Sequence, residues 1–136
     1  MIKPIVHDPN QLAHPAVPAT KADLPLATDL LETLKAHANE CVGMGANMIG
    51  SNKAAIVVQM GPLAVVMFNP EIINKHDAYQ ATEGCLSLTG ERSTTRYHQI
   101  TVKFQDRNFK PQQQQFSDWI AQIIQHEIDH CHGILI

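Results

Sequence analysis

The sequence predicts an α+β fold in which antiparallel strands lie between an early helix and a C-terminal helix. Apolar residues recur at helical spacing near the start and at the end of the chain, and between these segments they form short runs or alternate with polar residues. The 136 residues are 44% apolar, which fits one domain with a substantial core. We therefore expect a single domain over residues 1–136.

The composition excludes several classes of protein. Ten Lys and Arg against 13 Asp and Glu give a net charge of −3, without the basic block that nucleic acids or anionic membranes attract. The longest uncharged run, residues 54–70, contains Gly61 and Pro62 and is shorter than the roughly 20 residues of a spanning helix. The three cysteines cannot all pair, and the first residues lack the apolar segment of a signal peptide. We therefore expect a cytoplasmic protein without a membrane segment.

Two helices are predicted from the apolar spacing. Residues 1–23 contain four prolines and should follow the surface in extended and turn conformations. Leucines at helical spacing predict a first helix over residues 25–39. The last helix should begin after Ser117, a suitable N-cap, and end at Gly133.

Four strands are predicted between the helices. Two apolar runs are separated by a Gly-Pro turn, the second of them ending at Asn69-Pro70, and a later alternating segment is followed by a turn and a hairpin partner. The four predicted strands cover residues 53–60, 63–68, 100–105 and 109–116.

The last helix carries the pattern His126-Glu127-Ile128-Asp129-His130. Histidines at i and i+4 share one helix face and can bind one metal ion, and Glu127 can act as general base on a metal-bound water. The alternative is a pair of partly exposed helix histidines. Asp129 has two interpretations as well: it orients a ligand histidine or it is a solvated helix residue.

A third metal ligand must come from upstream, because the positions after the helix offer none. Cys85 is the best candidate, since it lies in Glu83-Gly84-Cys85-Leu86-Ser87, where Gly84 would let the backbone turn and present the thiol. The Leu86 backbone N–H beside it could donate to an oxyanion. The alternative is that Cys85 is a small core residue, as we expect for Cys131, while Cys41 packs at a helix end.

Two segments, 83–87 and 125–135, resemble two of the signature motifs of peptide deformylases, in the right order. Weaker likenesses extend over residues 5–9 and 69–72. The resemblance implies antiparallel sheets packed around the metal-binding helix. It also implies an enzyme that removes the formyl group from the N-terminal formyl-methionine of new bacterial proteins.

The resemblance also implies roles for individual residues. Cys85, His126 and His130 would bind one divalent metal ion, ferrous iron in the cell, with zinc, nickel or cobalt as substitutes. Glu127, Leu86 and Gly45 would form the catalytic group. The residues expected to contact the substrate are Gly43, Met44, Arg92 and Ile123, although Arg92 has a surface charge as its alternative.

The third motif of the family, Gly-x-Gly-x-Ala-Ala-x-Gln, is where this sequence departs. Aligned on Gly43 and Gly45, the chain has Asn47 and Met48 in place of the alanines and Gly50 in place of the glutamine. That glutamine helps to hold the oxyanion, and losing one such donor typically costs about 100- to 1000-fold in rate. Asn47 and Gln59 are possible substitutes for its amide.

Three hypotheses follow. The chain is an active or weakly active deformylase, or it acts on a different N-acyl or amide substrate, or it is a non-catalytic descendant that binds peptides. The first implies a formylated peptide as partner, with a possible transient ribosome contact and no sequence-specific nucleic-acid binding.

Overall fold

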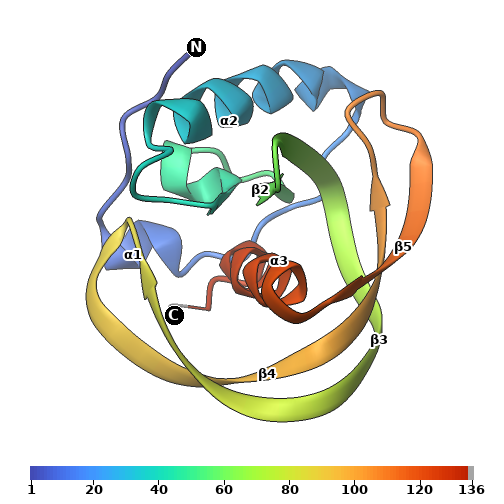
Figure 1. The fold of residues 1–136 in the computed structure, drawn as a ribbon. Coiled ribbons are helices and arrows are strands. Elements are labelled where there is room, and N and C mark those ends of the chain that lie inside the picture. Colours follow the sequence, from blue (N-terminus) through green and yellow to red (C-terminus); the bar gives the residue numbers. More distant parts are fainter. Residues whose placement is uncertain (135–136) are drawn as a thin grey trace.

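A computed structural model describes residues 1–134 of the chain (Figure 1). Its regular structure comprises three α-helices, two 3₁₀ helices and five strands within those residues. The helical elements are α1 (Pro9–Leu12), η1 (Lys21–Asp23), α2 (Leu24–Ala36), η2 (Ala46–Ile49) and α3 (Asp118–Cys131). The strands are β1 (Gly43–Gly45), β2 (Ala55–Met60), β3 (Leu63–Cys85), β4 (Leu88–Gln105) and β5 (Pro111–Ser117).

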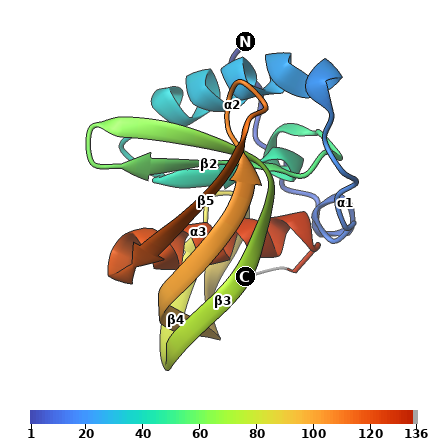
Figure 2. The same ribbon diagram turned by 90° about the vertical axis from the view of Figure 1, so that its right-hand side faces the viewer.

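The five strands form one antiparallel sheet in chain order, β1-β2-β3-β4-β5. Each strand pairs with the one before it, and η2 lies in the connection between β1 and β2. β3 and β4 are long and strongly curved, and α3 lies within their curve (Figures 1 and 2). The C-terminal helix is therefore packed against the sheet, as the sequence predicted.

Two apolar clusters hold the helices to opposite faces of the sheet. β2 alternates between them: Ala55 and Val57 join the cluster that contains α2, while Ile56 and Val58 join the cluster that contains α3. Successive side chains of a strand point to opposite faces, so a strand that is covered on both faces is apolar throughout. This explains the continuous apolar run that the sequence shows at this strand.

The predicted strand end at Asn69-Pro70 is wrong. β3 continues to Cys85, and the sheet accommodates Pro70 through a register shift against β4 between Phe68 and Glu71, with Asn69 at a positive φ of 50°. A bulge is one of the few places where a strand tolerates proline, because Pro has no N–H to donate. β4 likewise begins at Leu88, well before the alternating segment that predicted it.

Other predictions are confirmed with small changes. The first helix runs over Leu24–Ala36, β5 is the expected hairpin partner, and Gly133 follows the last helix at a φ of 72°. Ser117 holds the N-cap position without a side-chain capping bond. The proline-containing N-terminal segment, residues 1–23, also contains α1 and η1, which the sequence did not predict. Within residues 1–134, no helix is long and apolar enough to cross a membrane.

Candidate metal centre

Three side chains far apart in the sequence meet between α3 and the end of β3. His126 and His130 lie one turn apart on α3, and Cys85 is the last residue of β3. One ligand atom from each residue lies within 4.8 Å of the others, and the Cys85 Sγ is 3.3 Å from the His130 Nε2. The two predicted histidines and the predicted cysteine are therefore brought together.

The donor set fits a divalent transition metal. In a tetrahedral site with ordinary Zn–S and Zn–N bonds, a sulfur and a nitrogen ligand lie about 3.5 Å apart, close to the separation of Cys85 and His130. Both histidines are buried, and burial lowers the pKa of His130 to about 3, which keeps that imidazole neutral and able to ligate. Burial also lowers the pKa of His126, but hydrogen bonds with Cys85 and Glu83 outweigh it and raise that pKa to about 10, so this ring would release a proton on binding a metal. A thiolate with two imidazoles suits iron, zinc, cobalt and nickel alike.

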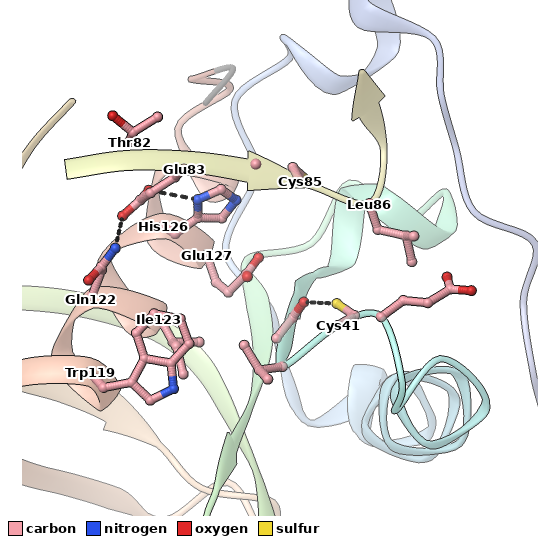
Figure 3. A pocket seen from close by; sticks show the side chains of 14 residues that line it. Cys41, Thr82, Glu83, Cys85, Leu86, Trp119, Gln122, Ile123, His126 and Glu127 are labelled. Carbon is pink, nitrogen blue, oxygen red and sulfur yellow. Dashed lines mark hydrogen bonds and ion pairs between the residues drawn. The ribbon is translucent and has the colours of Figure 1, made fainter. Parts of the chain in front are cut away.

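Glu83 orients the first histidine. The Nδ1–H of His126 donates to the Glu83 Oε1 at 2.9 Å, which leaves Nε2 free to face a metal (Figure 3). The side-chain amide of Gln122, one turn earlier on α3, donates to the other Glu83 oxygen at 2.9 Å. A carboxylate on the outer nitrogen fixes the tautomer of a ligand histidine and raises its basicity.

Arg96 holds Glu83 in turn. It is only 3% exposed and donates to both Glu83 oxygens, and its Nη1 donates to the Asp129 Oδ2 at 2.7 Å. Asp129 thus bonds to Arg96, which bonds to Glu83, and not to a histidine among the described residues. One arginine on β4 thus ties the end of β3 to the last turns of α3.

The pKa values of the two glutamates of the centre are shifted in opposite directions. Burial raises the pKa of Glu83, but the hydrogen bonds from His126 and Arg96 outweigh it and lower the pKa to about 2. Burial raises the pKa of Glu127 to about 7, and its Oε1 has no hydrogen-bond partner among the described residues. A carboxyl group with a pKa near neutrality is suited to take up and release a proton.

Of these residues, Cys85, His126, Glu127, Glu83 and Gln122 line a pocket of about 220 Å³. Figure 3 shows the Glu127 carboxylate in the middle of the lining side chains, with His126 on one side and Leu86 on the other. Ile123 forms part of the apolar wall, and Trp119, 60% exposed, stands at the start of α3. A polar centre at the bottom of a partly apolar pocket is the usual arrangement of a small-molecule or peptide site.

The comparisons with known proteins decide the family. A family model described as polypeptide deformylase matches residues 2–136. The chain belongs to this family. It is 48% identical over 136 residues to a peptide deformylase from Clostridium beijerinckii, covering 100% of both chains.

Solved deformylase structures share its fold. A peptide deformylase from Legionella pneumophila superimposes with a TM-score of 0.88 at 31% identity, covering 99% of this chain and 83% of that one. A class I type b peptide deformylase from Acinetobacter baumannii, solved with Met-Ala-Ser bound, gives a TM-score of 0.88 at 28% identity, covering 99% and 97%.

Among the other residues that the deformylase resemblance selected, Leu86, Gly43 and Ile123 line the pocket and three do not. Gly43 and Ile123 lie against Glu127, where a Cβ at Gly43 would be 2.9 Å from the Glu127 Oε2. Gly45 instead packs against His130, Met44 is fully buried in the cluster under α2, and Arg92 makes only a long bond to the Thr89 carbonyl. The substrate contacts expected of Met44 and Arg92 therefore have no support from their positions.

Position 50, where the third deformylase motif has its glutamine, does not line the pocket, and neither do Asn47 and Gln59, whose amides were considered as substitutes. Gly50 ends η2 at a φ of 85°, and a Cβ there would meet nothing within 4 Å. The Asn47 amide donates to two backbone carbonyls, and that of Gln59 donates to the Gly61 carbonyl. Position 50, where the resemblance places the glutamine, is thus exposed and does not line the pocket. The segment that aligns with this motif forms a short strand, β1, followed by the 3₁₀ helix η2, rather than one extended stretch.

The sequence did not predict the contacts of Arg96 and Gln122 with Glu83, or that Cys41 lines the pocket. The contact of Arg96 with Glu83 depends on the β3–β4 pairing, which no local sequence pattern predicts. Gln122 could have been found, since it stands one turn before His126. Cys41 lines the pocket and donates to the Gly43 carbonyl at 2.7 Å, and burial raises its pKa to about 12, so it is a neutral thiol there.

Proposed function

We propose that this chain is a metal-dependent peptide deformylase that removes the formyl group from N-terminal formyl-methionine. The observation that carries the proposal is the convergence of Cys85, His126 and His130 beside a buried Glu127, with Cys85, His126 and Glu127 lining a pocket. A hydrolytic metal site needs three protein ligands and a nearby base, and this arrangement offers both.

Cys85, His126 and His130 would hold one divalent ion. When bound, such an ion lowers the pKa of its water and polarises the formyl oxygen. The resemblance to the family favours ferrous iron in the cell, with zinc, nickel or cobalt as substitutes.

The chain's own residues supply the proton transfer and the orientation. Glu127 takes a proton from the attacking water and passes it to the departing amine, which leaves formate and a free N-terminus. Its pKa of about 7 suits both steps. The Leu86 N–H would donate to the oxyanion, and Glu83 with Arg96 would keep His126 in its orientation.

The wall of the pocket would bind the methionine side chain. Ile123 supplies apolar surface, and Gly43 leaves the space beside Glu127 open because it has no Cβ. The neutral Cys41 thiol adds an uncharged surface at the same wall. The substrate is accordingly a formylated peptide. That it is met in the cytoplasm, through a transient ribosome contact, is implied by the family resemblance and not by this pocket.

The test compares two acyl groups on one peptide. A chain that acts on other N-acyl substrates would release other acyl groups as well, and a chain that only binds peptides would release none. Protein purified without oxygen and loaded with nickel or ferrous iron should release formate from formyl-Met-Ala-Ser and no acetate from acetyl-Met-Ala-Ser. Release of acetate at a comparable rate would favour a broader amidohydrolase, and release of neither would contradict the proposal.

A further inference from the structure

The two histidines of the centre are held in different ways. The ring of His126 is fixed by a side-chain bond to Glu83. The ring of His130 is 1% exposed, and its Nδ1 has no hydrogen-bond partner within residues 1–134. The only hydrogen bond of this ring among the described residues is the one between its Nε2 and the Cys85 Sγ, so the position of His130 also depends on how the backbone of α3 is held.

That backbone lies at the end of a helix, where the last carbonyls have no partner within the helix. The His130 carbonyl accepts from the Gly133 N–H at 3.1 Å and, as its link to the rest of the chain, from the Asn47 Nδ2 at 3.1 Å; the Cys131 carbonyl accepts from the Ala16 N–H at 2.8 Å. The same Asn47 Nδ2 donates to the Leu12 carbonyl at 3.2 Å. One amide therefore joins α3 to the N-terminal segment.

The packing around Asn47 is close. A Cβ at Gly45 would lie 2.7 Å from the His130 Cβ and 3.1 Å from the Asn47 Oδ1, so both groups border the same narrow space. The adjoining turn is equally tight, because a Cβ at Gly133 would lie 2.3 Å from the Ala13 carbonyl. Little freedom is left for the last turn of α3 to move independently of η2.

We propose that Asn47 is a positioning residue for the metal centre: by binding the His130 carbonyl and the Leu12 carbonyl, it holds His130 at the distance from Cys85 that one metal ion requires. The inference rests on the proposed metal site. It also explains why an asparagine stands at this position, since its amide provides two donors to two buried acceptors.

Asn47→Asp tests the donors with almost no change of shape. The carboxylate would face the two carbonyl oxygens without a proton to share, so the last turn of α3 should shift. Asn69→Asp is the matched control. The Asn69 Nδ2 also joins the N-terminal segment to the rest of the chain, through the Ala19 carbonyl and the Gln105 side chain, and it touches no residue of α3.

The readouts are zinc affinity, by competition with a chromogenic chelator, and the visible absorption of the cobalt-loaded protein. Asn47→Asp should weaken zinc binding by about 10- to 100-fold and alter the cobalt spectrum, the size expected for loss of a residue that supports a ligand. Asn69→Asp should lower the melting temperature. It should leave the zinc affinity within about threefold of wild type and the cobalt spectrum unchanged. Equal zinc affinity and cobalt spectra in the two variants would overturn the inference.

If Asn47→Asp does not fold, Asn47→Ser takes its place. The shorter side chain loses at least one of the two bonds, so zinc affinity should still fall, and wild-type affinity in this variant would overturn the inference. A wild-type protein that binds neither zinc nor cobalt would instead contradict the proposed metal site itself.

Discussion

Glu83 and Glu127 show how one small site gives two carboxyl groups different chemistry. Glu83 accepts hydrogen bonds from an imidazole, an amide and a guanidinium, and these keep it ionised. Glu127 is buried beside Gly43 and Ile123 and is easily protonated. The first can therefore orient a ligand while the second exchanges a proton.

Glu127→Gln should lower turnover of formyl-Met-Ala-Ser by at least about 100-fold, because the amide cannot take a proton from water. Metal content should stay at one ion per chain, since the carboxylate is not one of the three ligands. Formate release and elemental analysis of the same preparation check both points. Glu91→Gln, at an exposed position of β4, is the control, and an equal loss of activity there would contradict the assignment.

The Glu127→Gln variant should be more stable than wild type in the metal-free state. Because folding raises the pKa of Glu127 from 4.5 to about 7, the folded protein holds this proton more tightly than the unfolded chain. Its contribution to stability is complete below about pH 4.5 and is lost as the pH rises through 7. Urea unfolding of chelator-treated protein should show a gap between Glu127→Gln and wild type that grows from pH 4.5 to 7. A gap independent of pH would contradict the raised pKa.

The helix α3 is fixed on two sides. On one side Arg96 of β4 bonds to Asp129 and, through Glu83, to His126. On the other side β1 approaches so closely that only glycine fits at two positions, Gly43 against Glu127 and Gly45 against His130. The metal ligands thus owe their positions to the strands around the helix as much as to the helix itself.

Arg96→Met should destabilise the fold by about 3 kcal/mol, because it leaves the buried Glu83 without its cation. Chemical denaturation at pH 7 measures the loss. Arg107→Met removes an exposed arginine with one long bond to Thr28 and should cost less than about 1 kcal/mol. Similar losses in both variants would mean that the buried ion pair contributes little.

Gly45→Ala should cost about 1–3 kcal/mol, since the new methyl group would overlap the His130 Cβ and push β1 away from α3. It should also weaken metal binding. Gly84→Ala is the comparison within the same centre, because its Cβ would meet nothing closer than 3.6 Å. If Gly84→Ala proved the more harmful, the account of the close β1–α3 packing would be wrong.

At the level of the whole molecule, local patterns predicted the parts with local causes. The two helices, the apolar β2 and the β4–β5 hairpin follow from periodicity and turn residues, and the i, i+4 histidines follow from helical geometry. Cys85 was selected through its motif, and a turn at Leu86 and Ser87 follows it directly. Gly84 does not adopt a positive φ, and the irregularity there is a register shift at the end of β3.

The features that the sequence did not predict depend on long-range pairing. The long middle parts of β3 and β4 are largely polar, and their continuity comes from pairing with each other across Pro70 and several register shifts. Arg96 reaches Glu83 only through that pairing. The same holds for Asn47, whose partners Leu12 and His130 lie at opposite ends of the chain.

The measurement that tests the central claim most directly is formate release against metal content. Protein stripped with a chelator should release no formate from formyl-Met-Ala-Ser, and added nickel should restore release up to one equivalent per chain. Cys85→Ser should need far more metal for the same rate, because a hydroxyl is a poor replacement for a thiolate. Release by the stripped protein, or a Cys85→Ser variant that titrates like wild type, would contradict a metal centre formed by Cys85, His126 and His130.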